Sequence, residues 1–270
     1  MANLTSLILR IFAVALLALI AVGFFWQPHD PHAVDLSNTL LKPSWTYWLG
    51  TDHLGRDLAS RLMVGAQTSV LAIVIVLVSS IGIGVIAGAV IALGPTTLSR
   101  TLRWLAETVL TVPTFILALV LAALFGAGLI AIAAALIVST WAPYALSLAA
   151  LFDRLRSEQY WQASLAMGSD LPGALRRHML PNTLPILGAL AGADAGRAVI
   201  LVASLGFLGL SADTGHPEWG AMIHDYRMFL FSEPRLVLTP IIATSMLAFL
   251  LNRSLDRDDW VSGLRPRSRT

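Results

Sequence analysis

The chain has 270 residues and a net charge of +2; 56% of its residues are hydrophobic and only 13% are charged. Soluble domains carry about 25% charged residues, so this composition excludes an ordinary soluble enzyme and indicates a polytopic membrane protein. The absence of cysteine excludes disulfide frameworks, thiolate metal sites and cysteine nucleophiles, and so small a net charge gives no indication of nucleic-acid binding.

A membrane core of about 30 Å is crossed by roughly 20 apolar residues in a helix. Six stretches meet this requirement, at residues 7–26, 68–94, 104–125, 129–152, 183–210 and 236–251. The sequence therefore predicts an all-α polytopic membrane protein with six transmembrane helices. The first stretch has an alternative interpretation as a signal peptide, but it is long enough to cross the bilayer, and no small-residue cleavage site follows Trp26.

The basic residues indicate the orientation of these spans. If the N-terminus lies inside, twelve Lys and Arg residues fall on the cytoplasmic side and five on the external side, and Arg197 lies within the fifth span. Because an excess of Lys and Arg marks cytoplasmic loops, this distribution predicts that both termini are cytoplasmic. An even number of spans agrees with that prediction.

The first hydrophilic segment, residues 27–67, is expected outside. Its aromatic run at residues 45–48 indicates a piece lying at the membrane surface. The glycines that follow indicate tight turns around Asp52 and Arg56, and residues 57–67 suit a short helix leading into the second span. A structured linker held by Asp–Arg pairs is an equally sufficient interpretation of this segment.

Two interruptions and one packing motif stand out within the spans. Pro113 and Pro143 fall inside the third and fourth stretches, where proline allows kinks. Gly84 and Gly88 have the spacing that favours close packing of helices.

The cytoplasmic segment at residues 153–182 is longer than a connection between two spans requires. It predicts two short helices around Gly168, the first anchored by Tyr160, Trp161 and Leu165, with Arg176 exposed on the second. Such an amphipathic loop is a plausible docking surface for a soluble partner. The alternative is an interfacial helix that rests on lipid headgroups.

Ionisable residues inside a membrane are costly and therefore candidates for function. Asp194 and Arg197 are three residues apart in the fifth span, which puts them on one helical face. They could contact a transported solute, form a structural ion pair or face the cytoplasmic vestibule. The six histidines lack metal-ligand spacing, so no metal site is predicted, and the only lysine is Lys42, which excludes a P-loop for ATP.

The segment before the fifth span resembles a known motif. Gln162-Ala163-Ser164 is followed by Gly168 after three residues, and His178-Met179-Leu180-Pro181 comes nine residues later. This pattern is similar to the EAA loop of bacterial ABC importer permeases (E-A-A-x3-G-x9-I-x-L-P). The departures are Gln162 for the family's Glu, Ser164 for the second Ala and His178 for the usual Ile.

Two more motifs narrow the resemblance. Residues 49–62, with LGTDHLGRD followed by SRL, look like the external signature of the second ("C"-type) permease subunit of the dipeptide, oligopeptide and nickel branch. Residues 203–210 and 218–223 look like the end of its fifth span and the loop that follows. Val202 stands where peptide permeases often have Glu, which looks somewhat more like nickel or metallophore permeases, and Asn252-Arg253-Ser254 replaces the family's usual Gly-Asp near the end.

The resemblance implies a type I ABC importer permease in the bacterial inner membrane, with residues 1–26 as an N-terminal transmembrane helix and residues 27–67 as a periplasmic segment. Residues 68–255 would form the core permease domain, with a periplasmic loop at 211–234, and residues 256–270 a cytoplasmic tail. The implied coupling residues are Gln162, Ala163, Gly168, Arg176, Leu180 and Pro181, and the implied periplasmic signature residues are Gly50, Thr51, Asp52, Gly55, Arg56 and Asp57.

The resemblance also implies partners: a homologous permease subunit in a heterodimer, two ATP-binding subunits, and a periplasmic or lipid-anchored solute-binding protein. The chain itself would bind no cofactor and would not be an enzyme, because the partner subunits hydrolyse ATP. The cargo stays open between di- or oligopeptides and nickel or a metal chelate. The alternatives are an ion-gradient-driven secondary transporter or channel, for which no internal repeat is evident, and an intramembrane enzyme, for which no nucleophile–base pair is evident.

Overall fold

The computed structural model describes residues 23, 26–167, 173, 177, 180–211 and 217–255. Within these residues the chain consists of helices and connecting turns, with one isolated β-bridge between Thr51 and Asp57. The predicted all-α class is therefore confirmed. Only Gly23 and Trp26 of the predicted first span belong to the described residues.

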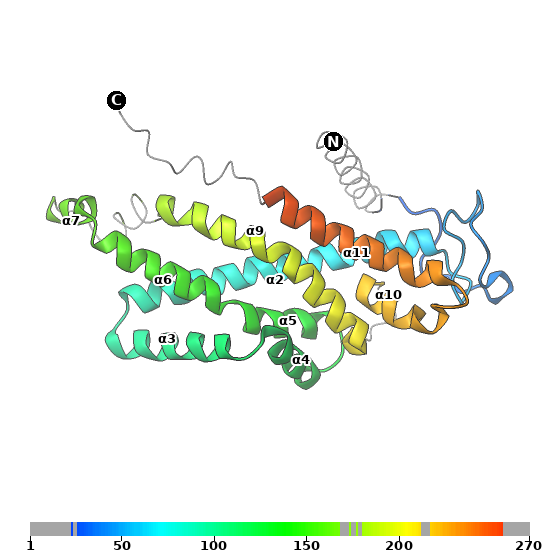
Figure 1. The fold of residues 1–270 in the computed structure, drawn as a ribbon, viewed down its shortest axis with the longest axis horizontal. Helices are drawn as coiled ribbons and strands as arrows, with labels where there is room; N and C mark the ends of the chain where they lie inside the picture. The colour runs from blue at the N-terminus through cyan, green and yellow to red at the C-terminus, as the bar shows by residue number, and fades with distance from the viewer. Residues whose placement is uncertain are drawn as a thin grey trace, which may run out of the picture.

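The longer helices follow one another along the chain in this order: α2 (Leu58–Leu93), α3 (Thr96–Thr111), α4 (Thr114–Phe125), α5 (Leu129–Thr140), α6 (Ala142–Arg156), α7 (Gln159–Ala166), α9 (Leu180–Leu205), α10 (Trp219–Tyr226) and α11 (Pro234–Leu255). Three single turns accompany them, η1 (Leu36–Asn38), η3 (Gly206–Leu210) and η4 (Arg227–Phe229). Helices α2, α6, α9 and α11 run roughly along the long axis of the molecule, with α7 at one end and α10 near the other (Figure 1).

Four helical stretches of the described chain are long and apolar enough to cross a membrane, namely Leu58–Leu93, Leu129–Arg156, Pro181–Leu210 and Pro234–Asn252. The pair α3 and α4 adds a fifth if it is counted as one bent span. These stretches correspond to the second to sixth predicted spans. The total of six stays a prediction, because the first span lies almost entirely outside the described residues.

Helix α2 begins at Leu58, whereas the predicted span begins at residue 68. Asp57 caps its first turn by accepting a hydrogen bond of 3.0 Å from the Ser60 amide. The predicted short helix at residues 57–67 is thus the start of one helix of 36 residues. At 1.5 Å per residue this helix is about 54 Å long, so it must tilt or extend beyond a membrane core of about 30 Å.

Residues 104–125 do not form one continuous helix, and the kink that Pro113 allows is present. Helices α3 and α4 are bent by 100° relative to each other, and Val112 between them is extended, with φ −89° and ψ 130°. The reason is Pro113, whose ring disfavours helical backbone at the preceding residue. Pro143, by contrast, lies in the first turn of α6, where its missing N–H is tolerated, so α5 and α6 together count as one span.

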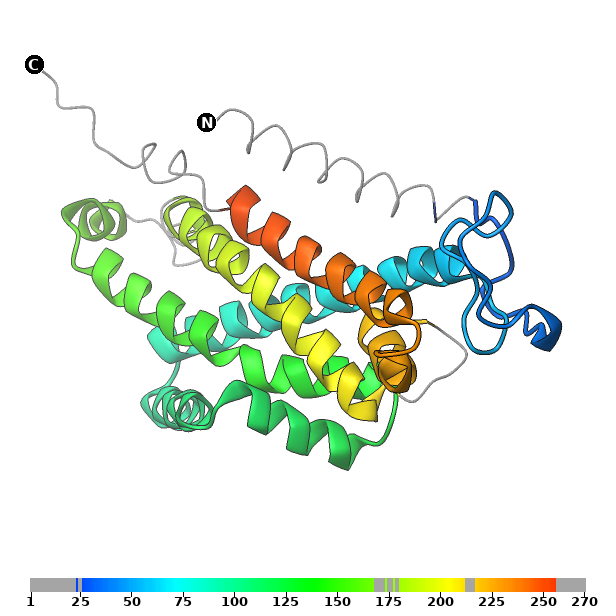
Figure 2. The ribbon, with the colours of Figure 1, turned by 45° about the vertical axis from the view of Figure 1, so that its right-hand side comes forward.

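The core is built around α2, which packs on α6 at one end and on α9 and α10 at the other. Close packing at Gly84 and Gly88 is confirmed: a Cβ atom at Gly88 would lie 2.6 Å from the carbonyl oxygen of Ala145 on α6. Toward the opposite end, the fully buried Trp219 of α10 donates a hydrogen bond of 3.0 Å to the Leu62 carbonyl. The second view shows α9 and α11 side by side across α2 (Figure 2).

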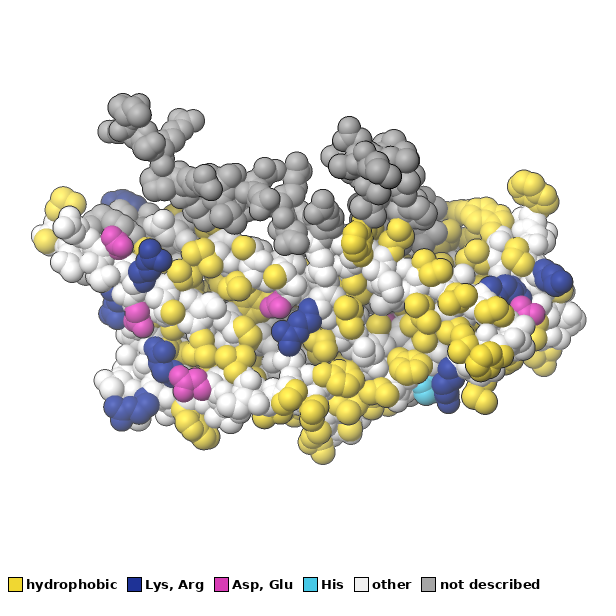
Figure 3. Space-filling model, viewed as in Figure 1, with side chains coloured by type: hydrophobic (Ala, Val, Ile, Leu, Met, Phe, Trp, Pro, Cys, Tyr) yellow, Lys and Arg dark blue, Asp and Glu magenta, His cyan; other side chains and the backbone are white. Residues whose placement is uncertain are grey.

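The distribution of hydrophobic and charged side chains on the surface follows the long axis of the molecule. On the face seen in Figure 3, hydrophobic side chains cover much of the middle, apart from one small charged patch, and other charged side chains gather toward the two ends. Exposed large hydrophobic residues occur along the membrane-length helices, such as Ile86 on α2, Ile130 on α5 and Phe249 on α11. This distribution is the one expected of a bundle whose middle lies in lipid.

Candidate functional site

The external motif folds around Asp52, whose side chain is fully buried. Asp52 accepts hydrogen bonds from the Arg56 side chain at 2.7 Å, from the Leu54 and Arg56 amides at 2.8 and 2.9 Å, and from the Tyr226 hydroxyl at 3.1 Å. Arg61 lies 3.7 Å away and donates to the same Tyr226 hydroxyl at 3.0 Å. The network therefore ties the external segment to α2 and to α10.

The pKa of Asp52 reflects these contacts. Burial alone raises it, but the charge of Arg56 and the hydrogen bonds from Arg56 and Leu54 outweigh burial and lower the pKa below its ordinary value. Burial raises the pKa of the Tyr226 hydroxyl. Asp52 is consequently ionised and Tyr226 is neutral at physiological pH, which is the state that their hydrogen bond requires.

The remaining signature residues shape the backbone. Gly50 and Gly55 have φ of +76° and +74°, so the predicted tight turns at glycine are confirmed. The Thr51 hydroxyl accepts a hydrogen bond of 2.8 Å from the Leu41 amide. The Leu49 carbonyl accepts one of 2.7 Å from Arg235, in the first turn of α11. The external segment is thereby fixed to the start of a second membrane-length helix.

Glu218 was not predicted as a site residue, although it begins the resembling loop at residues 218–223. Its side chain caps α10 by accepting hydrogen bonds from the Gly220 and Ala221 amides at 2.8 and 2.9 Å, and Ser69 of α2 donates to it at 3.3 Å. All three donors are uncharged. Because Glu218 is only 1% exposed, burial raises its pKa, although the two amide hydrogen bonds oppose the shift.

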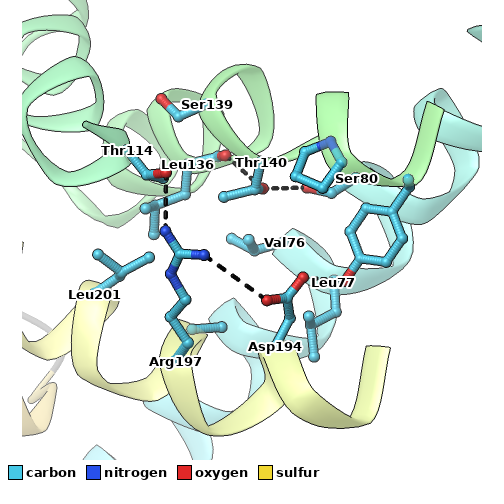
Figure 4. A pocket seen from close by; sticks show the side chains of 13 residues that line it. Val76, Leu77, Ser80, Thr114, Leu136, Ser139, Thr140, Asp194, Arg197 and Leu201 are labelled. Atoms are coloured by element: carbon cyan, nitrogen blue, oxygen red, sulfur yellow. Dashed lines mark hydrogen bonds and ion pairs between the residues drawn. The ribbon is translucent and has the colours of Figure 1, made fainter. Parts of the chain in front are cut away.

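Asp194 and Arg197 lie on one face of α9, as their spacing predicts, and form an ion pair of 4.0 Å. Asp194 accepts a hydrogen bond of 2.8 Å from the Tyr144 hydroxyl of α6. Arg197 donates one of 3.0 Å to the Thr114 hydroxyl, at the start of α4. Figure 4 shows the two charged side chains projecting from α9 toward the helices that carry Thr114 and Val76.

These residues line a cavity of about 30 Å³ between α2, α4, α5, α6 and α9. Ser80 and Thr140 share a hydrogen bond of 2.7 Å in its wall. A cavity needs about 10–15 Å³ of such space to hold one water molecule, so this cavity has room for water but not for a peptide or a metal chelate.

Sequence reasoning missed Tyr144 and Thr114, the partners of the charged pair. Each directly follows a proline that was singled out, Pro143 or Pro113. A polar side chain next to a proline within an apolar stretch is the signal that could have found them, because both occur where a regular helix begins again.

At the opposite end, α7 carries the first part of the predicted coupling motif. Gln162 and Ala163 are exposed, while Trp161 is 3% exposed and packs in a cluster with Phe152 of α6 and Leu187 of α9. Leu180 is the first residue of α9, and Pro181 is exposed. Gly168 and Arg176 lie outside the described residues. No group of histidine and acidic residues suited to a metal ion occurs in the described part of the chain.

Comparison with known proteins places the chain among transport components. The family described as "Binding-protein-dependent transport system inner membrane component" matches residues 80–257. The nickel transport system permease protein NikC of Escherichia coli (strain K12) is 36% identical over 258 residues, which cover 94% of this chain and 92% of NikC. A Brucella suis biovar 1 (strain 1330) protein that bears the name of a peptide permease is 34% identical over 202 residues, covering 75% of this chain and 67% of that protein.

A bundle of membrane-length helices with an ordered polar cap at one end and an exposed short helix at the other is the fold of an integral membrane protein. The chain belongs to the family of binding-protein-dependent transport system inner membrane components. The prediction of an ABC importer permease related to the peptide and nickel branch is confirmed. The ion-gradient alternative receives no support from these relatives.

Proposed function

We propose that this chain is the second permease subunit of an ATP-driven importer and forms half of a pore with a homologous permease. Two ATP-binding subunits would dock inside and hydrolyse ATP, and a periplasmic or lipid-anchored solute-binding protein would deliver cargo outside. The observation that carries the proposal is the relation to NikC, which extends over nearly the full length of both chains. The EAA-like segment before the fifth span supports it.

In the proposed orientation both termini are cytoplasmic. Helix α7 belongs to the predicted cytoplasmic segment, and the network around Asp52 belongs to the predicted external segment. The two lie at opposite ends of the long axis (Figure 1), which supports this arrangement. The chain would then present its docking helix to the cytoplasm and its ordered cap to the periplasm.

We infer that the segment at residues 153–182 transmits the motion of the ATP-binding subunits to the pore. The buried Trp161 supports this role, because it packs α7 against both α6 and α9, so a displacement of α7 would move both helices. Gln162, Ala163 and Pro181 are exposed and available to a partner. Shifting a two-state pore from 1:99 to 99:1 takes about 5.5 kcal/mol, which requires a partner with different contacts in the two states.

Asp194 and Arg197 are our candidates for the cargo path. They are half-exposed, they face a cavity, and they bridge α6 and α4 through Tyr144 and Thr114. In an inward- or outward-open state these contacts would separate and offer one acidic and one basic group to a hydrophilic solute. Peptides and metal chelates both carry charged groups that Asp194 and Arg197 could contact.

The face of α9 and α11 supports pairing with another permease. An open groove of about 530 Å³ runs between these helices, lined mainly by apolar side chains such as Phe207, Ile241 and Phe249. Small and hydroxyl residues, including Ala203, Ser204 and Thr244, also line it, and such residues are typical of helix–helix interfaces in membranes. A transmembrane helix of the second permease would fill it.

The decisive experiment is uptake by the assembled transporter. The chain is co-expressed with the neighbouring permease, ATPase and binding-protein genes, reconstituted in vesicles, and supplied with radiolabelled nickel, a nickel chelate or a labelled dipeptide. We expect ATP-dependent uptake of one of these cargo classes and none without the ATP-binding subunits. Uphill transport by the purified chain alone would overturn the proposal.

The coupling role has its own test. Gly168→Trp should abolish uptake and uncouple ATP hydrolysis from transport while membrane insertion stays normal, because the motif requires a small residue between two short helices. Gly82→Trp is the matched control, since Gly82 is exposed on α2 and a Cβ atom there meets nothing within 4 Å. Normal uptake by Gly168→Trp would discredit the docking role of residues 153–182.

A further inference from the structure

The external segment ends in an unusual display of aromatic surface. In the aromatic loop, residues 43–49, Trp45 is 98% exposed and Trp48 is 49% exposed. Phe231 and Met228, on the neighbouring connection between α10 and α11, are 96% and 79% exposed. Contact of such side chains with water is unfavourable, and large exposed apolar patches mark surfaces that contact lipid or another molecule.

The exposure of Trp45 is built into the fold. The Ser44 amide donates to the Tyr47 carbonyl at 2.8 Å, and the Gly50 amide donates to the same carbonyl at 2.9 Å. The Tyr47 amide donates to the Ser44 hydroxyl at 3.0 Å, and the Tyr47 ring stacks on His29 with centroids 4.8 Å apart. The loop thus holds Tyr47 inward and leaves Trp45 at the outside of a closed turn.

Two independent contacts fix the depth of this loop. The Trp48 ring lies 5.7 Å from the ring of Trp26, and Trp26 ends the first predicted span. On the other side, Arg235 donates to the carbonyls of Leu49 and Thr51 at 2.7 and 3.3 Å, and Arg235 lies at the start of the membrane-length stretch Pro234–Asn252. Both contacts put the aromatic loop level with the end of a span.

We propose that the aromatic loop is a membrane-surface anchor, with Trp45 inserted among the lipid headgroups of the outer leaflet. Trp and Tyr are the residues that prefer this layer, where an apolar ring and a polar N–H or O–H are both accommodated. The exposed Lys42 beside the loop suits contact with lipid phosphates. Phe231 and Met228 extend the apolar surface, because the adjacent Phe229 stacks on His53 at 5.1 Å.

The anchor gives the external segment a function beyond linking two spans. It holds the cap around Asp52 flat on the bilayer, so that the start of α2 and the start of α11 keep a fixed position relative to the membrane surface. The assignment of the anchor to the outer leaflet rests on the proposed orientation of the chain. Its position at a membrane surface is independent of that orientation.

The chain contains no cysteine, so single-cysteine variants carrying a nitroxide label can measure depth directly. Trp45→Cys is compared with Leu36→Cys, a matched apolar residue that is 71% exposed in the same segment, and with Ile86→Cys on α2, 68% exposed, as the reference inside the membrane. The labelled chain, assembled with its partner subunits, is placed in vesicles of phosphatidylethanolamine and phosphatidylglycerol. Relaxation of each label by oxygen and by chromium oxalate is then recorded.

We expect the ratio of oxygen to chromium oxalate relaxation at position 45 to be severalfold higher than at position 36 and lower than that at position 86, because the headgroups lie between water and the hydrocarbon. Equal relaxation at positions 45 and 36 would overturn the anchor. Protection at position 45 that develops only after the solute-binding protein is added would also overturn it and would mark the loop as a protein contact. Because Trp45 is exposed, its replacement leaves the contacts of Trp48 and Tyr47 intact.

Discussion

The network around Asp52 and the pair Asp194–Arg197 both combine aspartate and arginine side chains, but the two sites differ in burial. Asp52 is completely buried, and its carboxylate accepts four hydrogen bonds. Asp194 and Arg197 are 31% and 57% exposed, are separated by 4.0 Å, and face a cavity with room for water. The first arrangement cannot change without leaving a charge buried alone, whereas the second pair faces a space that water can enter.

We propose that this contrast separates charges that hold the fold from charges that serve transport. A transporter needs one end that keeps its shape and a path that alternates between two states. In this proposal the cap around Asp52 has the first task and the centre of the bundle has the second. Substitutions at three positions test that division.

The largest effect is expected from Asp52→Asn. The amide keeps the shape of the side chain but leaves Arg56 and Arg61 without their buried counter-charge, which costs about 3–5 kcal/mol. The unfolding temperature of the purified protein in detergent should fall, together with its accumulation in membranes. Asp30→Asn, at an exposed position of the same segment, should leave both unchanged. A normal unfolding temperature for Asp52→Asn would break the comparison.

Asp52→Asn should also change how the stability of the protein depends on pH in the acidic range. Because the pKa of Asp52 in the folded protein lies below its ordinary value of 3.8, its stabilising contribution is present above that value and is lost as the pH falls through the folded-state pKa. Unfolding measured from neutral to acidic pH should therefore show a steeper loss in the parent protein than in Asp52→Asn. Parallel curves would exclude this linkage.

A smaller effect, on transport and not on stability, is expected from Asp194→Asn. The amide oxygen can still accept the hydrogen bond from Tyr144, and Asp194 faces a cavity with room for water, so assembly should be normal. Uptake should nevertheless fall about 5–150-fold if the charge biases the pore by about 1–3 kcal/mol. Glu107→Gln is the control, because Glu107 is an exposed acid on α3 that lies outside the proposed coupling segment and cargo path. Equal uptake by the two variants would make the membrane pair merely structural.

The smallest effect is expected from Glu218→Gln, which sharpens the comparison with a buried acid whose donors among the described residues are all uncharged. Since the folded-state pKa of Glu218 lies above its ordinary value of 4.5, its contribution to stability is full below that value and is lost as the pH rises through the folded-state pKa. Glu218→Gln keeps one acceptor oxygen but turns its NH2 group toward the Gly220 or Ala221 amide, so it should cost about one hydrogen bond, roughly 0.5–1.5 kcal/mol, and should remove the loss at higher pH.

Glu218→Ala provides the contrasting variant, because it leaves the Ser69, Gly220 and Ala221 donors unpaired, at a cost of about 1–3 kcal/mol. Unfolding of both variants across the pH range distinguishes a pH-dependent carboxyl from a mere helix cap. An unchanged pH profile in Glu218→Gln would contradict the raised pKa.

Local features of the site were accessible to sequence reasoning. The turns at Gly50 and Gly55 followed from the conformational freedom of glycine, and the pairing of Asp194 with Arg197 followed from their separation of three residues on a helix. Features that join distant segments were not accessible. Tyr226 lies 174 residues from Asp52, and no pattern in either segment indicates that they meet.

The third span shows the same limit within a single helix. Pro113 indicated a kink, but a proline in a long helix can bend the helix slightly or break it. The outcome depends on which residues contact the two helix ends at the break. Here Thr114 finds Arg197 on α9, and α4 packs on α5, so the chain turns by 100°. The membrane-length criterion, which counts only apolar residues, does not register such a turn.

The amino-acid sequence by itself determined that this is a helical membrane protein, because the bilayer imposes length and hydrophobicity on each segment separately, and its resemblance to the permease family rested on motifs that are contiguous in the chain. Only the tertiary structure decided which charges are locked and which are free. Burial and counter-charge are properties of the space between helices, and α2, α6, α9 and α10 bring together residues that the chain holds far apart.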